Sequence, residues 1–184
     1  MAITYPLTLP TVAGIASINL RAVNAVAVSS SPFTYKQQVI AHQGQRWEAE
    51  VTLPPMTRAD AETWIAFLVS LQGARGTFTM GDPNAASARG SASVTAGTPL
   101  VNGADQTGGS SATLHKVLQD VDSNASGQAT LELWPYIRTA PSDNAIITVG
   151  DTVGVFRLSS NQTDWSINNA SFYGITFAAV EAVA

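Results

Sequence analysis

Apolar and polar residues alternate between positions 46 and 53, which predicts a strand with one buried and one solvent-facing side. The apolar set is Trp47, Ala49, Val51 and Leu53, and the polar set is Arg46, Glu48, Glu50 and Thr52. Two prolines at 54 and 55 end the strand.

A helix is expected over about residues 57–72. Thr57 is placed to accept a hydrogen bond from the free backbone N–H near Asp60, and acidic residues suit the positive end of a helix. Apolar residues fall on one helical face, namely Ala61, Trp64, Ile65, Leu68 and Leu71. Gly73 stands where a left-handed residue closes a helix. A strand at 77–80 then ends at the turn of residues 81–83.

Further strands are predicted on both sides of this unit. Alternation runs through 16–28 and again through 37–41, and a turn at 42–45 predicts an antiparallel hairpin over residues 36–53. Residues 1–15, which contain two prolines and a glycine, favour an extended arm that docks on a neighbouring subunit. Near the other end, strands are expected at 156–158, 163–167 and 173–180.

The composition changes after Pro83, which predicts a domain boundary there. Residues 84–113 consist mostly of Ala, Ser, Gly, Thr and Asn, with possible strands at 91–95 and 100–101. Strands are also expected at 114–122, 129–134 and 146–149. Several short strands separated by turns are typical of a small all-β barrel or sandwich.

The composition is that of a globular protein without the charge needed to grip nucleic acid. The 184 residues are 45% hydrophobic and 12% charged, and nine basic residues against thirteen acidic ones give a formal charge of −4. No cysteine occurs, so disulfides and thiolate metal sites are excluded. We expect neither a cleaved signal segment nor membrane insertion. The low charge density fits either a surface covered by other subunits or a Ser/Thr-rich β-protein.

Candidate chemistry is sparse. Glu48 and Glu50 lie on one strand face about 7 Å apart, a spacing open to paired glycosidase carboxylates. Neighbours on a wet face are more often solvated or paired with a cation across the strands, such as Lys36 or an arginine of another subunit. His42 and His115 have no ligand-spaced partners. No phosphate-binding glycine loop or serine elbow occurs, so we expect no enzyme, metal or cofactor.

Aromatic residues form two groups with different expected uses. Trp134, Tyr136 and Arg138 surround Pro135, and aromatic faces beside polar groups stack on sugars or on proteins. These three residues are therefore candidates for contact with a glycan or partner, or for packing within their own region. Trp47 and Trp64 occupy the apolar phase of their elements and are expected in the core.

Several stretches together resemble tail-tip proteins of long-tailed bacteriophages, with distal tail proteins the nearest match. The main ones are Ser-Pro-Phe-Thr-Tyr-Lys-Gln-Gln at 31–38, Arg-Trp-Glu-Ala-Glu-Val-Thr-Leu-Pro-Pro-Met at 46–56, Trp-Ile-Ala-Phe-Leu at 64–68 and Leu-Gln-Gly-Ala-Arg-Gly-Thr-Phe-Thr-Met-Gly-Asp-Pro at 71–83. The resemblance continues through residues 101–104, 133–138 and 155–158.

This resemblance implies a mainly β fold, a β-sandwich with one packed α-helix plus a small inserted all-β barrel or sandwich domain. Residues 1–83 and 156–184 would form the ring-forming belt domain, with its helix at about 57–72. Residues 84–155 would form the inserted domain. Belt domains of this family form rings, commonly of six subunits, that join the tail tube to the hub carrying receptor-binding parts.

The expected function is therefore structural, in the tail tip of a virion assembled in the bacterial cytoplasm. The implied partners are other copies of the chain, the tail tube protein, and a tail hub or tape-measure protein. DNA would pass through the lumen without specific binding, since like charge keeps it from the wall. Arg46, Glu48 and Glu50 are candidates for an assembly or lumen surface. The alternatives are a carbohydrate-binding module acting through the inserted domain, and a tail-lysin hydrolase, for which no catalytic set is found.

Overall fold

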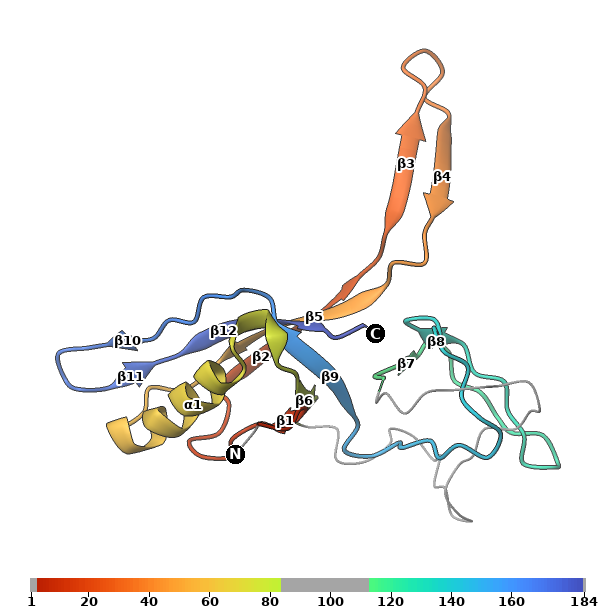
Figure 1. Cartoon of the computed structure of the whole chain (residues 1–184). Helices are drawn as coiled ribbons and strands as arrows, with labels where there is room; N and C mark the ends of the chain where they lie inside the picture. The colour runs from red at the N-terminus through yellow and green to blue at the C-terminus, as the bar shows by residue number, and fades with distance from the viewer. Residues whose placement is uncertain (1–2, 84–112, 184) are drawn as a thin grey trace.

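The computed structural model describes residues 3–83 and 113–183 (Figure 1). The protein is mainly β with one α-helix, which confirms the predicted fold class. The possible strands at 91–95 and 100–101, with much of the expected inserted domain, lie outside the described residues. Within the described ranges no helix has the length and apolar character to cross a membrane.

A six-stranded sheet forms the centre of the molecule, in the order β1-β6-β9-β12-β5-β2. Its strands are β1 (Leu7–Thr8), β2 (Ser17–Val23), β5 (Arg46–Thr52), β6 (Phe78–Gly81), β9 (Val153–Leu158) and β12 (Thr176–Glu181). Strand β1 runs parallel to β6, and the other neighbours are antiparallel. The last strand, β12, therefore lies between β5 and β9 and joins both ends of the chain into one sheet.

The helix α1 (Arg58–Ser70) packs on one face of this sheet. Alternation along the strands turns Val51, Phe177 and Phe156 towards the helix, where Trp64 and Leu68 meet them. Aromatic rings fill the centre, with the centroids of Phe67 and Phe78 5.6 Å apart at 78°. The predicted apolar helix face is confirmed: Ala61, Trp64, Leu68 and Leu71 are buried, and Ile65 packs beside them.

The ends of α1 differ in detail from the prediction. Thr57 is the N-cap residue, but its hydroxyl donates to Asp60 Oδ2 (3.1 Å) and makes no hydrogen bond to the backbone. At the other end Gln72 is the first left-handed residue, with φ of 54°, and Gly73 follows with φ of 68°. Two consecutive left-handed residues turn the chain into a short 3₁₀ helix, η1 (Gly73–Arg75).

The N-terminal segment packs on its own chain, so the expectation of an extended arm in place of a packed element is wrong for residues 3–15. Strand β1 pairs with β6, and the Tyr5 hydroxyl donates to Ser70 O at 2.6 Å. Trp64 Nε1 donates to Val12 O at 2.9 Å. Apolar side chains at 5, 7, 9, 12 and 15 pack against the core. Their spacing is irregular, so the sequence carries no periodic sign of this packing.

The predicted hairpin over residues 36–53 is also wrong. Strand β4 (Gln37–Ala41) pairs with β3 (Val26–Ser30), and β5 pairs with β2. The chain therefore forms one long hairpin whose tip is at 31–36. Residues 42–45 lie opposite only residues 24 and 25, because Val23 pairs with Arg46 and Val26 with Ala41. The turn signal at 42–45 marks a bulge between two ladders.

Residues 24–45, with β3 and β4, form a projection that we call the spike. In Figure 1 it rises away from the sheet and helix. Every residue of β3 and β4 is exposed. The spike is thus a two-stranded ribbon outside the body of the molecule.

The region after residue 112 carries little regular structure. Strands β7 (Lys116–Val117) and β8 (Leu133–Trp134) pair with each other inside the spans predicted for them, but are much shorter. Residues 146–149 form no strand of two or more residues. Strand β9 begins at Val153, three residues before the strand predicted at 156–158. A last ribbon consists of β10 (Ser166–Ile167) and β11 (Tyr173–Gly174).

Candidate functional site

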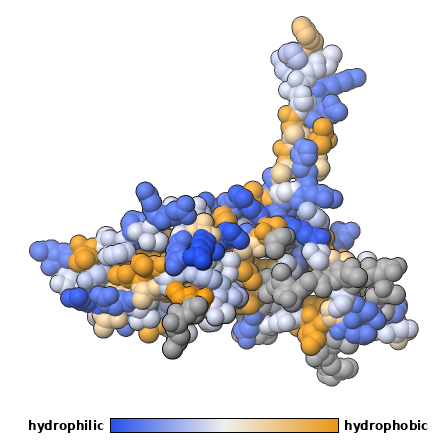
Figure 2. All heavy atoms as spheres, viewed as in Figure 1, coloured by the Kyte–Doolittle hydropathy of each residue, from blue (hydrophilic) through white to orange (hydrophobic). Residues whose placement is uncertain are grey.

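The spike presents an apolar face to its surroundings. Paired residues of an antiparallel ribbon lie on the same side, so Val26 and Ala41 share a face with Val28 and Val39. We call these four residues the apolar face of the spike. Val28 is 58% exposed and Val39 61%. Figure 2 shows hydrophobic residues along the spike, with hydrophilic ones between them.

The tip of the spike is an ordered loop that carries two exposed aromatic residues. Ser31 Oγ accepts hydrogen bonds from the N–H groups of Phe33 and Thr34, each 3.4 Å long. Ser31 O also accepts from Tyr35 N at 2.9 Å. Phe33 is 92% exposed and Tyr35 82%. The loop therefore holds both aromatic side chains in solvent.

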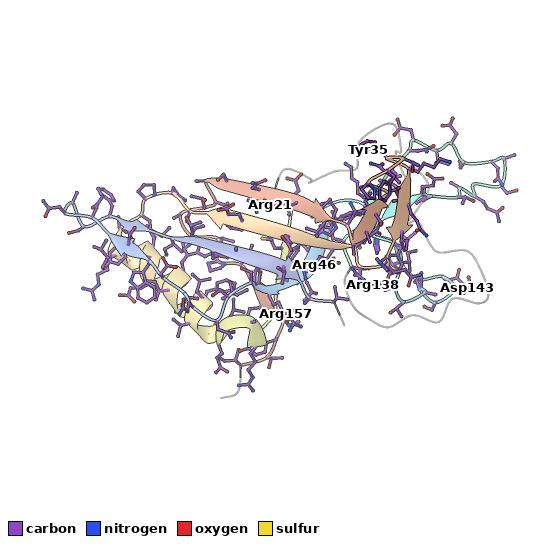
Figure 3. All side chains as sticks on the ribbon, turned by 90° about the horizontal axis from the view of Figure 1, so that it is seen from above. Arg21, Tyr35, Arg46, Arg138, Asp143 and Arg157 are labelled. Carbon is purple, nitrogen blue, oxygen red and sulfur yellow. The ribbon has the colours of Figure 1, made fainter. Side chains whose placement is uncertain are left out.

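The sheet face away from α1 holds the polar residues that the sequence singled out. Figure 3 looks down on the sheet, with Arg21 over β2 and Arg46 over β5. Arg21 Nη2 lies 2.8 Å from Glu50 Oε2, and Arg46 Nη2 lies 2.7 Å from Glu48 Oε1. The cation opposite these carboxylates is thus an arginine of the same chain, and Lys36 is on the spike instead. Arg46 therefore pairs with Glu48, whereas Glu50 pairs with Arg21 of the neighbouring strand.

Trp134, Tyr136 and Arg138 meet at the root of the spike. Trp134 Nε1 donates to Asn24 Oδ1 at 2.7 Å, and Tyr136 N donates to Gln45 Oε1 at 2.9 Å. The Arg138 guanidinium donates to the Gln45 carbonyl and lies 5.8 Å from the Tyr136 ring centre. All three residues therefore attach the segment after residue 112 to the two sides of the spike root.

Trp47 and Glu181 complete this junction from the sheet side. The Trp47 ring meets Trp134 edge-on at 4.6 Å, and its Nε1 donates to Leu114 O at 2.9 Å. Trp47 is only partly buried, whereas Trp64 is fully buried as predicted. Glu181 Oε2 accepts from Trp47 N at 3.1 Å. The sequence reasoning missed Glu181, although it follows Phe177 and Ala179 in the inward phase of β12.

The described residues hold no cluster of metal-ligating side chains. His115 bonds to Pro135 O (2.8 Å) and Thr113 Oγ1 (2.9 Å), and His42 is exposed in the bulge of the spike. Within ranges 3–83 and 113–183, no three His, Asp or Glu side chains cluster in a way that would hold a metal ion.

Comparison with known proteins adds no identification. No protein-family model and no curated protein matches the sequence.

Proposed function

We propose that the protein is a structural subunit of a bacteriophage tail tip, which assembles into a homo-oligomeric ring between the tail tube and the host-recognition hub. The sequence stretches at 31–38, 46–56, 64–68 and 71–83, which resemble distal tail proteins, support this proposal. The mainly β fold with one helix on the sheet is compatible with the belt domain that the resemblance implies. The resemblance to distal tail proteins suggests a ring of six copies.

The observation that carries the proposal is the exposure of the apolar face of the spike within the described part of the chain. A two-stranded hairpin alone is marginally stable in water, and needs a further strand or a packing partner. In the described part of the chain, no helix or strand covers Val28 and Val39, which stay largely exposed. We infer that another molecule packs on this face. A second copy of the chain suffices, because one heterologous contact repeated around a ring satisfies every protomer.

The rest of the surface suits a ring with neighbours on both sides. The chain is acidic overall, with a formal charge of −4, so a ring of copies repels DNA that passes through it. Arg46, Glu48 and Glu50 lie on the open sheet face, which is available to line a lumen or to meet another subunit. The tail tube protein would bind one side of the ring, and a hub or tape-measure protein the other.

The test measures assembly of the full chain. Light scattering after size-exclusion chromatography and negative-stain microscopy should show a closed ring with a central hole for the wild-type protein. The double variant Val28→Ser/Val39→Ser should shift the mass towards the monomer and leave the melting temperature of the monomer nearly unchanged. The matched control is Val69→Ser on α1, an exposed valine whose replacement has little effect on helix propensity. This control should still form rings.

The proposal also predicts that the protein is present in purified virions. A wild-type chain that stays monomeric and is absent from virions would refute it. The carbohydrate-binding alternative rests on no comparable observation, because the Trp134 indole N–H and the Arg138 guanidinium bind groups of their own chain. Glycan binding that is lost in Trp134→Ala would nevertheless favour that alternative.

A further inference from the structure

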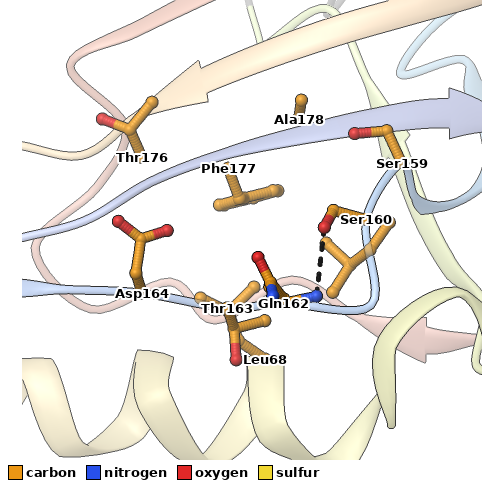
Figure 4. Close-up of a pocket in the computed structure, with 10 residues that line it drawn as sticks. Leu68, Ser159, Ser160, Gln162, Thr163, Asp164, Thr176, Phe177 and Ala178 are labelled. Atoms are coloured by element: carbon orange, nitrogen blue, oxygen red, sulfur yellow. Dashed lines mark hydrogen bonds between the residues drawn. The ribbon is translucent and has the colours of Figure 1, made fainter.

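A pocket of about 190 Å³ opens beside the C-terminal half of α1 (Figure 4). Its apolar floor includes Leu68 and Phe177, which are buried side chains of the core. Its rim is polar and includes Gln162, Asp164 and Thr176. The pocket thus combines an apolar base with hydrogen-bonding groups at its mouth.

The pocket exists because two paired segments separate and meet again. Strands β9 and β12 pair up to Leu158, and Ser159 N then donates to Ala178 O at 3.0 Å. The following residues leave β12, and the chain pairs again only where β10 meets β11. Gln162 N donates to Ser160 Oγ at 3.0 Å, which orders the loop across this gap. The opening is therefore part of the sheet's architecture.

The tip of the spike has the complementary chemistry. Tyr35 has an apolar ring with a polar end, and a cavity of ~150 Å³ is sufficient to bind a benzene ring. Lys36 follows it and is the only Lys, Arg, Asp or Glu in residues 24–45. Asp164 is likewise the only one in residues 158–180. Neither side chain forms an ion pair within the described residues.

We propose that the pocket receives the spike tip of a second copy of this chain, with the Tyr35 ring over Phe177 and Leu68 and the Lys36 ammonium at Asp164. The tip and the pocket lie apart on one chain, because the spike points away from the sheet and helix (Figure 1). The contact is therefore made between copies. A tyrosine ring that fills a pocket is a common interface hot spot, and a charged pair at the rim favours the correct orientation of the two surfaces.

This inference rests on the proposed ring. It assigns the repeated contact of the ring to two different surfaces, the spike tip of one subunit and the pocket of the next. Each protomer offers one tip and one pocket, so the contact is heterologous and propagates in one direction until the ring closes. A single tip buries little area, but in a closed ring each subunit is held by two such contacts. The opposite single charges of tip and pocket orient the approach.

The test compares assembly of full-length variants by light scattering over a dilution series. Tyr35→Asn removes the ring while keeping a residue that tolerates the left-handed backbone at φ of 54°. It should raise the concentration for half-assembly by roughly 30-fold, the equivalent of about 2 kcal/mol for a hot-spot truncation. Tyr35→Phe, which keeps the aromatic ring, should stay much closer to wild type.

Charge reversal tests the pairing directly. Lys36→Asp and Asp164→Lys should each weaken assembly roughly tenfold or more, and the double variant should recover most of the loss. Arg58→Asp is the control, because it makes the same change of charge at the exposed start of α1. It should assemble as wild type does. Thermal unfolding of each variant confirms that the monomer remains folded.

The possible results separate this inference from the proposed function. If the wild type forms rings and Tyr35→Asn forms them equally well, the ring stands and the tip-in-pocket contact is refuted. If both single charge reversals weaken assembly but the double variant recovers nothing, the Lys36–Asp164 pairing is refuted. A wild-type chain that remains monomeric refutes both. A soluble glycan that binds wild type but not Asp164→Ala, with rings unaffected by Tyr35→Asn, would assign the pocket to carbohydrate instead.

Discussion

Arg138 and Glu181 join the segment after residue 112 to the last strand of the sheet, with 3.6 Å between Nη1 and Oε1. Both side chains are largely withdrawn from solvent, at 19% and 5% exposure. Glu181 also accepts the Trp47 backbone N–H, and the Arg138 guanidinium donates to the Gln45 carbonyl. The pair therefore links three parts of the chain at the root of the spike.

Replacing Arg138 should lower the free energy of unfolding more than replacing Glu181. Arg138→Ala leaves the Glu181 carboxylate buried without its cation, and we expect it to lower the free energy of unfolding by about 3 kcal/mol. Glu181→Gln keeps an acceptor for Trp47 N–H and should cost about 1.5 kcal/mol. Urea unfolding measures both. Arg58→Ala, in an exposed pair with Glu62, is the control and should cost about 0.5 kcal/mol or less. Equal losses in Arg138→Ala and the control would contradict this account.

Trp64 should hold the N-terminal segment through its indole. Trp64→Phe removes the donor to Val12 O and part of the buried volume, so we expect a loss of about 2 kcal/mol in unfolding free energy. In Trp64→Phe, the rate of amide hydrogen exchange should increase more in residues 3–15 than it does in β5. Tyr5→Phe removes the hydroxyl bond to Ser70 O alone, and should cost about 1 kcal/mol. Unchanged exchange in residues 3–15 would show that the indole bond does not anchor this segment.

Gly73 has a left-handed backbone, and Asn161 occupies the space that a side chain at this position would need. The φ of Gly73 is 68°, and a Cβ there would lie 2.8 Å from Asn161 Cα. Gly14 has φ of 63° with open space around it, so it isolates the backbone effect. We expect Gly14→Ala to cost about 1 kcal/mol, and Gly73→Ala about 2 kcal/mol more because Asn161 must move. Thermal unfolding of the two variants measures the difference, and equal melting temperatures would exclude the steric contribution.

The ion pairs on the open sheet face should contribute little to stability. Arg21 and Glu50 are 57% and 47% exposed, so solvent screens their attraction. Arg21→Ala should lower the unfolding free energy by less than about 1 kcal/mol, and raising the salt concentration should reduce that difference further. Urea unfolding at two ionic strengths tests this. A larger loss that does not depend on salt would mean that Arg21 acts through packing.

Local patterns predicted individual elements more reliably than their pairing. The alternation through 46–53 and the helical spacing from Ala61 to Leu71 reflect which side of an element is buried, and both were confirmed. The hairpin was assigned to the wrong turn, because residues 31–36 and 42–45 both carry turn-forming residues. Only the registers of β2 with β5 and of β3 with β4 together show that 42–45 is a bulge.

For the candidate site, the sequence likewise indicated single residues but not the contacts that they make. Trp134, Tyr136 and Arg138 could be selected from composition, but their contacts with Asn24 and Gln45 join residues about ninety or more positions apart, at separations of 110, 91 and 93. Glu181 could have been found from its place in the alternation of β12. The pocket beside α1 had no sequence signal, because it arises where two strands separate.

The sequence alone determined the mainly β class, the position and buried face of the one helix, and the strands with a clear alternation, because each depends on periodicity within a few neighbouring residues. The tertiary structure decided which strands pair and that residues 3–15 pack against the chain's own core. It also decided that residues 24–45 project as a spike with an apolar face that no helix or strand of the described residues covers. Those outcomes depend on contacts between distant segments, whose energies are summed over the whole fold and leave no local pattern in the chain.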